Sequence, residues 1–139
     1  MGNPFVHCEL SADDVGAARK FYTKLFDWKI GKADPTMGDY AMIDMGSKMS
    51  GGGLTKKMSP GQPTAWLNYV EVASVKRTMA KAEKLGAKAV LAFQEIGPMG
   101  AIGIFMDPQG AAIGIWEKGK PVKKAAKTKA TKKKPAKKK

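Results

Sequence analysis

The chain repeats a helix pattern at an offset of sixty residues. Residues 14–25 and 74–85 both place mostly small or apolar side chains at the spacing i, i+3, i+7, i+10, which is one face of an amphipathic helix. The two stripes are Val15, Ala18, Tyr22 and Leu25, and Val75, Thr78, Ala82 and Leu85. Asp14 and Ser74 precede them, and either side chain can cap a helix N-terminus. A unit used twice predicts a site built between its two copies.

The segments around the two helices correspond as well. Residues 5–10 precede the first helix as residues 65–72 precede the second, and each pattern predicts a strand. Further strand-like runs follow each helix, at 28–30, 40–45 and about 49–54 in the first half and at 87–91, 101–106 and 111–116 in the second. The sequence therefore predicts an α+β fold in which a βαβββ unit occurs twice.

The charges divide the chain into two parts. All twelve Asp and Glu lie in residues 1–117 with thirteen of the Lys and Arg, so this part carries a formal charge of +1. The other twelve basic residues are lysines within 118–139, a segment without acidic or aromatic residues, which buries too little surface to offset its chain entropy. We expect one domain over 1–117, with modules at about 3–57 and 63–117, and a disordered tail over 118–139.

The sequence also indicates a compartment. No stretch approaches the eighteen or so apolar residues of a membrane span, and the N-terminus lacks the charged and apolar regions of a signal peptide. A single cysteine, Cys8, allows no internal disulfide and fits a reducing compartment. We expect a cytoplasmic protein, with Cys8 on the helix-packed face of its strand as a buried, unreactive thiol.

Several short motifs follow one another along the domain. They are His7-Cys-Glu-Leu-Ser-Ala-Asp-Asp14, Phe21-Tyr22, Leu25-Phe26-Asp27-Trp28 and, before the last strand, Asp107-Pro108-Gln109-Gly110. In order and spacing, residues 3–117 resemble the vicinal oxygen chelate superfamily, which includes glyoxalases, ring-cleaving dioxygenases and bleomycin-resistance proteins. The resemblance implies a cup-shaped mixed sheet with the helices outside and the site within, and a homodimer. Asp27 stands where the family often has glycine, so we expect it in a left-handed conformation.

Metal-dependent members of that superfamily draw four ligands from four strands. Carried over by position, these fall on His7, Leu67, Gly114 and one residue within 51–53. Three of the four positions therefore carry no donor side chain, and a cation held by one imidazole would be lost. We expect no metal cofactor. The residues leave open a displaced site of His7 with Glu9 and Glu71, because His7 and Glu9 alternate onto one strand face.

The same strand faces indicate a small-molecule site. His7 and Glu9 would face a ligand as hydrogen-bonding groups or as a general base, although a hydrogen-bonded histidine that fills the cup explains His7 equally. The predicted ligand-binding residues are His7, Glu9, Tyr40, Met42, Leu67, Tyr69, Gly114 and Trp116. Walls of aromatic and Met side chains are typical of small-molecule sites, but each apolar member would also serve as core.

The lysine-rich tail resembles those of linker histones and of some bacterial nucleoid proteins. Lysines spaced by alanine and proline present point charges to a phosphate backbone and release counterions without reading sequence. The predicted nucleic-acid-binding residues are Lys123, Lys124, Lys127, Lys129, Lys132, Lys133, Lys134, Lys137, Lys138 and Lys139. The alternatives are a solubilising tail and one attracted to an anionic membrane surface. Binding to DNA would associate the protein with the nucleoid.

Two functions are consistent with these patterns. The first is a protein of the glyoxalase and bleomycin-resistance type that binds a small organic molecule in its cup without the usual metal site, while its tail binds nucleic acid loosely. The second is an enzyme, a glyoxalase-like lyase or isomerase or a dioxygenase-related activity. Such an enzyme would act on a small oxygenated substrate through His7 and Glu9, with or without an unusual divalent metal.

Overall fold

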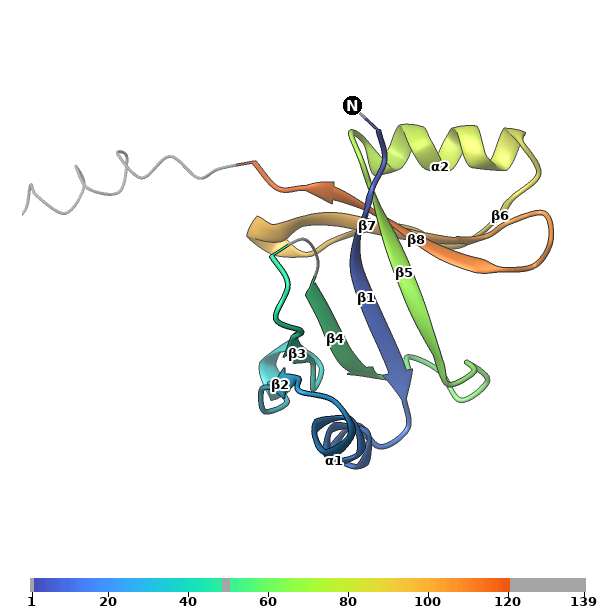
Figure 1. The fold of residues 1–139 in the computed structure, drawn as a ribbon. Coiled ribbons are helices and arrows are strands. Elements are labelled where there is room, and N and C mark those ends of the chain that lie inside the picture. The colour runs from blue at the N-terminus through green and yellow to red at the C-terminus, as the bar shows by residue number, and fades with distance from the viewer. Residues whose placement is uncertain (1, 49–50, 121–139) are drawn as a thin grey trace, which may run out of the picture.

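The computed structural model describes residues 2–48 and 51–120 of the chain. Two α-helices, α1 (Val15–Leu25) and α2 (Val75–Lys84), lie at opposite ends of the molecule in Figure 1. The strands are β1 (Phe5–Ala12), β2 (Lys29–Ile30), β3 (Ala41–Asp44), β4 (Gly51–Lys56), β5 (Ala65–Val72), β6 (Lys88–Glu95), β7 (Gly100–Met106) and β8 (Ala112–Lys118). Short 3-10 helices, η1 (Pro35–Met37) and η2 (Gly97–Met99), precede β3 and β7. The βαβββ unit occurs twice, as predicted.

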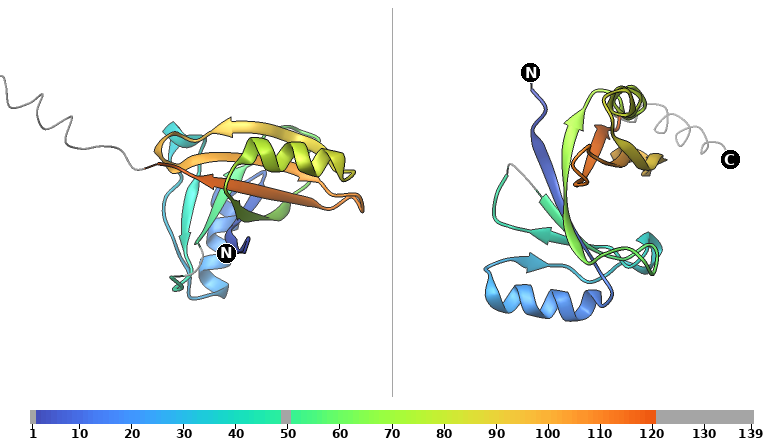
Figure 2. Two further views of the ribbon diagram at one scale, coloured as in Figure 1. Left: turned by 90° about the horizontal axis from the view of Figure 1, so that it is seen from above. Right: turned by 90° about the vertical axis from the view of Figure 1, so that its right-hand side faces the viewer.

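All these strands join in one sheet, in the order β2-β3-β4-β1-β5-β8-β7-β6. The two halves meet where β1 runs antiparallel to β5. Within each half the first strand runs parallel to the last, so that β1 lies beside β4 and β5 lies beside β8. The sheet curls without closing and both helices lie outside it (Figure 2), which confirms the predicted cup-shaped mixed sheet.

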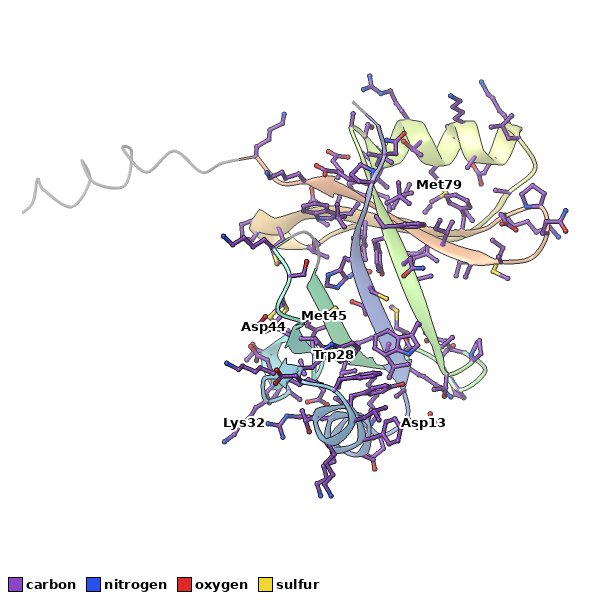
Figure 3. All side chains as sticks on the ribbon, viewed as in Figure 1. Asp13, Trp28, Lys32, Asp44, Met45 and Met79 are labelled. Atoms are coloured by element: carbon purple, nitrogen blue, oxygen red, sulfur yellow. The ribbon has the colours of Figure 1, made fainter. Side chains whose placement is uncertain are left out.

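Each helix packs on the outer face of its own half of the sheet. The core between α1 and the sheet consists of Leu10, Ala12, Val15, Ile30, Ala41, Ile43 and Leu54, and the core between α2 and the sheet consists of Val72, Val75, Met79, Ala101 and Ile115. Figure 3 shows Trp28 and Met45 near α1, and the side chain of Met79 on the side of α2 that faces the sheet; each belongs to or packs against the core of its half. Because side chains alternate along a strand, these outward positions leave the intervening residues on the concave face.

Both helices begin at the predicted caps. The Asp14 carboxylate accepts a hydrogen bond from the Ala17 N–H at 2.9 Å, and the Ser74 hydroxyl accepts one from the Arg77 N–H at 3.2 Å. These bonds satisfy N–H groups that a helix leaves without partners at its first turn. None of the helices in the described ranges is long and apolar enough to span a membrane.

The helix C-termini differ between the halves. Helix α2 is followed by Gly86 in a left-handed conformation, with φ of 102°, whereas α1 is followed by Phe26 in an extended one. The predicted left-handed conformation at Asp27 is therefore wrong. Among the described non-glycine residues, the positive φ belongs to Asp39, in the turn before β3. The extended exit from α1 brings Trp28 back against Tyr22, with ring centroids 5.7 Å apart.

Two further details concern the end of the last strand and the thiol of Cys8 in the first strand. Strand β8 continues to Lys118, and the Gly119 N–H donates to the Met99 carbonyl at 3.2 Å, so regular structure passes the predicted boundary at 117. Cys8 shares the outer face with Leu10 but is half-buried, and its thiol donates to Asn68 Oδ1 at 3.0 Å. Burial raises the pKa of the Cys8 thiol, which therefore stays protonated and weakly nucleophilic near neutral pH.

Candidate functional site

The centre of the concave face is strand β1, the inner strand that joins the two halves. Its outward residues Leu10 and Ala12 belong to the core under α1, so His7 and Glu9 lie on the opposite, concave face. Their side chains are 26% and 18% exposed, which leaves both within reach of a small molecule. The predicted pairing of these two residues on one face is present in the structure.

Tyr40 reaches His7 from the other side of β4. It immediately precedes β3, where Met42 pairs with Gly53 of β4, and Gly53 in turn pairs with Glu9 of β1. The Tyr40 ring lies directly over Gly53, in space that any side chain at position 53 would occupy. Glycine is therefore required at this position for the phenol to approach β1.

Tyr69 has the same relation to a second glycine. It lies on β5 opposite His7 and pairs on its other side with Gly114 of β8. A Cβ atom at position 114 would lie 2.5 Å from two carbon atoms of the Tyr69 ring. The ring is 4% exposed and cannot move without disturbing its neighbours. A tyrosine ring therefore covers a glycine in each half of the sheet.

These four residues, His7, Glu9, Tyr40 and Tyr69, form one group of hydrogen-bonded pairs in polar contact, which we call the inner cluster. The Tyr40 hydroxyl lies 2.7 Å from His7 Nε2, in a hydrogen bond whose direction depends on the histidine tautomer. The Tyr69 hydroxyl donates to Glu9 Oε1 at 3.4 Å, and Glu9 Oε2 lies 3.7 Å from His7 Nε2. The cluster thus sets one carboxylate and one imidazole between two phenols.

The electrostatics of the cluster keep both phenols neutral. Burial raises the pKa of Tyr40 and of Tyr69 well above the ordinary value of 10.0, and the negative charge of Glu9 raises it further. Both phenols therefore remain hydrogen-bond donors at physiological pH. A carboxylate beside two such donors can accept a proton or a hydrogen bond from a ligand, and the phenols can bind a ligand oxygen.

This pKa shift predicts a loss of stability in alkali. The unfolded chain releases its phenolic protons near pH 10, whereas the folded chain retains them, so stability falls as the pH rises from about 10 toward the raised values. Tyr69→Phe should remove up to about 1 kcal/mol per pH unit of that dependence. Urea unfolding of both proteins at pH of about 8 and 11 measures it. An unchanged pH dependence in the variant would contradict the shift at Tyr69.

The positions at which the superfamily would hold a metal do not form a metal site here. Strand β8 pairs with β5 as β4 pairs with β1, and this correspondence makes Gly53 the counterpart of Gly114. Two of the positions are thus glycines covered by tyrosine rings, a third is Leu67, and only His7 offers a donor. Within the described residues, no group of three or more His, Cys, Asp or Glu could hold a metal ion. The residues do not fit the metal, and the displaced site with Glu71 is not assembled.

The predicted apolar walls are only partly brought together. Leu67 pairs with Glu9 across β1 and β5, and Met42, 52% exposed, lies beside Gly53 on β3. Trp116 is farther along β8, opposite Glu71, where its indole N–H donates to the Met99 carbonyl at 2.8 Å. Its indole N–H is therefore already used by the protein.

Two wall residues were missed by the sequence analysis. Ile102 and Ile104 of β7 pair with Trp116 and Gly114 and alternate with the outward Ala101, which places them on the concave face. The alternation of Ile102 and Ile104 with small residues in 101–106 was the signal that could have identified them. They extend the apolar surface of the second half beside the inner cluster.

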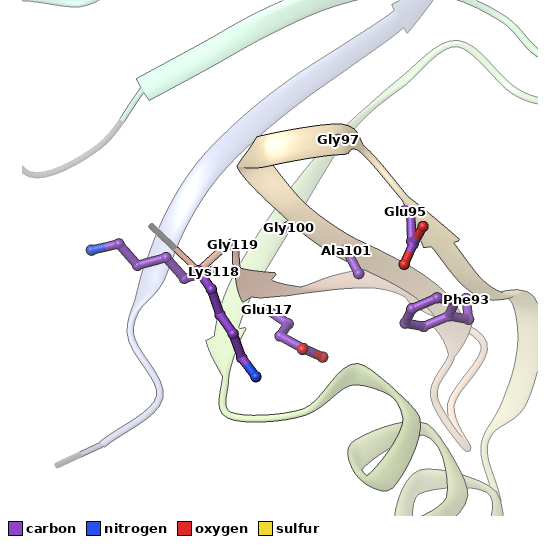
Figure 4. Close-up of a pocket in the computed structure, with 9 residues that line it drawn as sticks. Phe93, Glu95, Gly97, Gly100, Ala101, Glu117, Lys118 and Gly119 are labelled. Atoms are coloured by element: carbon purple, nitrogen blue, oxygen red, sulfur yellow. The ribbon is translucent and has the colours of Figure 1, made fainter. Parts of the chain in front are cut away.

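Two surface hollows lie outside the concave face. One, of about 290 Å³, lies between the ends of β6, β7 and β8 and is lined by residues that include Phe93, Glu95 and Glu117 (Figure 4). The Glu117 carboxylate there accepts the Val75 N–H at 2.8 Å and so caps α2. The other, of about 360 Å³, lies beside the start of α1. Neither hollow contains a residue of the inner cluster.

The chain is similar to one protein family and to several curated proteins. Residues 4–46 match the family described as bleomycin resistance protein-like N-terminal. CFP32 of Mycobacterium bovis, which carries the name of a glyoxylase, is 30% identical over 115 residues, covering 78% of this chain and 43% of that protein. The anthracycline biosynthesis protein DnrV of Streptomyces peucetius is 25% identical over 125 residues, covering 80% of this chain and 46% of that protein. The chain thus spans less than half the length of these curated relatives.

A solved structure shares the fold. Methylmalonyl-CoA epimerase from Mycobacterium tuberculosis superposes with a TM-score of 0.60 at 14% sequence identity, covering 88% of this chain and 91% of that chain. At this identity the likeness concerns the fold alone. The family match, the curated relatives and the shared fold together support the vicinal oxygen chelate superfamily for this chain, with a fold of the glyoxalase and bleomycin-resistance type.

Proposed function

We propose that the concave face binds a small organic molecule without a metal ion. The observation that carries this proposal is the inner cluster, in which a reachable carboxylate and imidazole lie between two neutral phenols. Polar groups of this kind, set among apolar side chains, fix the orientation of a bound molecule. Leu67, Met42 and Ile104 supply the apolar surface beside them.

The relatives support a ligand of this size class. CFP32 is named as a glyoxylase and DnrV as a protein of anthracycline biosynthesis, and both names refer to chemistry on small organic molecules. The partly exposed Tyr40 and the exposed Met42 favour a ligand with a flat apolar body, because aromatic rings and thioethers pack well against flat surfaces.

Filling the concave face should block binding. In Leu67→Trp a larger side chain occupies the space beside Glu9, and we expect affinity for the neutral, planar, fluorescent probe acridone to fall at least about tenfold. Leu85→Trp is the matched control, because Leu85 is exposed at the end of α2, outside the sheet. Fluorescence titration of the full chain measures both. Equal affinities in the two variants, or no binding by the parent chain, would contradict the proposal.

The second candidate function is catalysis by the same cluster. The specific observation that favours it is the position of Glu9 beside two protonated phenols. Glu9 would take a proton from a carbon next to a carbonyl, and the C–H electron pair would form a carbon–carbon double bond while the carbonyl π pair moves onto its oxygen. A phenol would donate a hydrogen bond to the enolate oxygen formed in this way. This is a lyase or isomerase chemistry that uses His7 and Glu9 without a metal.

Deuterium exchange distinguishes catalysis from binding. If the protein is an enzyme of this kind, deuterium from heavy water should enter hydroxyacetone faster with the parent chain than with Glu9→Gln, by at least about a hundredfold. Proton NMR measures this exchange directly. Equal rates for the parent chain, the variant and buffer would leave the binding function alone.

The tail supports a separate proposal, loose binding of nucleic acid. Its ten predicted lysines, from Lys123 to Lys139, lie outside the described residues, so the proposal rests on their charge and spacing. The domain they follow carries a formal charge of only +1, so the basic character of the chain is concentrated in the tail. With a single cysteine and this tail, we propose a cytoplasmic protein associated with the nucleoid.

We also propose a homodimer. Phe21, Leu25 and Phe26 are exposed on and after α1, and Trp66 of β5, which is also exposed, packs against Tyr22 of the same helix. Contiguous exposed apolar groups commonly mark an interface, and a second copy would supply about the length by which the curated relatives exceed this chain. Sedimentation equilibrium of Phe21→Glu against Leu85→Glu tests this assignment. A monomeric parent chain, or equal dissociation in both variants, would contradict it.

A further inference from the structure

The carboxylate of Glu9 has a distinctive set of neighbours. This carboxylate lies 3.4 Å from the Tyr69 hydroxyl and 3.7 Å from His7 Nε2, and it also interacts with the Tyr40 hydroxyl. No Lys or Arg of the described residues lies within ion-pair distance of it. The first contact is long for an O–H···O hydrogen bond and the second exceeds hydrogen-bond distance, so neither saturates a group that can accept about four hydrogen bonds.

A half-buried carboxylate that lacks its full set of hydrogen bonds can bind a hydrogen-bond donor of a ligand. The Glu9 side chain is 18% exposed, which is enough for one ligand atom to reach it but not for full hydration. Hydrogen bonds to charged groups in such surroundings are the stronger kind. The Glu9 carboxylate therefore has hydrogen-bonding capacity that the protein does not use, and this capacity is available to a ligand.

The groups around Glu9 act in the same direction. The ring of Tyr40 and the side chains of Met42 and Leu67 present apolar or electron-rich surface, which attracts a cation more than an anion. An anionic ligand would meet the Glu9 charge at short range in a medium of reduced dielectric constant. The Tyr69 hydroxyl, which could have bound an anion, donates to Glu9 instead.

Resting on the small-molecule function proposed above, we propose that the concave face takes flat ligands carrying a positive charge, which bind Glu9, and that it rejects anions of the same shape. Glu9 is the residue that determines this selectivity. Tyr69 positions its carboxylate.

Three fluorescent tricyclic probes of nearly equal size test the inference: cationic proflavine, neutral acridone and anionic acridine-9-carboxylate. Each is titrated into nucleic-acid-free full chain and into Glu9→Gln, at about 150 mM salt, which shortens the range of the tail's charge. The tail is the same in both proteins, so the comparison between them isolates Glu9. Tyr69→Phe, which keeps the carboxylate, is a further variant.

We expect Glu9→Gln to weaken proflavine binding about 10- to 100-fold and to strengthen binding of the anion. Acridone binding should weaken less than proflavine binding, because the glutamine oxygen can still accept a hydrogen bond from the acridone N–H. Tyr69→Phe should keep the preference for the cation. Circular dichroism of Glu9→Gln, which should match that of the parent chain, checks that the variant is folded. An identical ranking of the three probes in the parent chain and Glu9→Gln, with acridone still bound, would overturn the charge selectivity alone. Failure of all three probes to bind would instead overturn the proposed small-molecule function.

Discussion

Gly114→Ala should lower the free energy of unfolding by about 2–3 kcal/mol, the cost typical of overpacking a core. The added methyl group would lie 2.5 Å from two ring carbons of Tyr69. That ring is almost fully buried, so it can yield only by shifting β5 or β8. Urea unfolding followed by circular dichroism measures the change.

A matched control and a double variant identify the cause. Gly61→Ala adds the same methyl group where nothing lies within 4 Å, and it should change stability by less than about 0.5 kcal/mol. Tyr69→Ala removes the ring with which the added methyl group would collide. The loss in free energy of unfolding of the double variant, Gly114→Ala with Tyr69→Ala, should therefore be smaller than the sum of the two single losses by at least about 1 kcal/mol. Strict additivity would show that the ring over Gly114 is not the origin of the effect.

Replacing the ten tail lysines by glutamine should abolish most of the binding to duplex DNA. If six to eight lysines engage phosphates, the affinity of the parent chain falls by about a thousandfold or more between about 50 and 200 mM salt, because each contact releases counterions. The variant should lose that salt dependence along with its affinity at low salt. Fluorescence anisotropy with a labelled duplex across a salt series measures both quantities.

Replacing the same ten lysines by arginine is the control for charge. This variant keeps every positive charge, so its affinity and its salt slope should remain close to those of the parent chain. A glutamine variant that binds DNA as tightly as the parent, with the same slope, would move the binding to the folded domain and refute the assignment to the tail.

The fold could be predicted because the same pattern of strand and helix residues occurs twice in the chain. The pattern of residues 5–25 and its counterpart sixty residues later defined the strand, the helix and the caps of both halves, and the structure confirms each of them. Alternation along β1 placed His7 and Glu9 on one face, which is a property of any strand. Because the outer face is buried under α1, the register of β1 was strongly determined.

The hydrogen-bonded arrangement of the site could not be predicted in the same way. Tyr40 immediately precedes β3, and its approach to His7 depends on the absence of a side chain at Gly53, which lies on the next strand, β4. Three consecutive glycines, 51 to 53, have no side-chain pattern that fixes their register, so only the pairing of β4 with β1 identifies Gly53. The helix end at Asp27 was misjudged for a related reason: stacking of Trp28 on Tyr22 replaces the left-handed turn.

The central claim is that the concave face binds a small molecule through the inner cluster and without a metal. The measurement that tests it most directly is an NMR titration of the full chain with acridone, with and without a strong chelator. We predict shifts at Glu9, Leu67 and Gly114, with one dissociation constant in both conditions. Shifts confined to the hollow near Glu117, or binding abolished by the chelator, would contradict the claim.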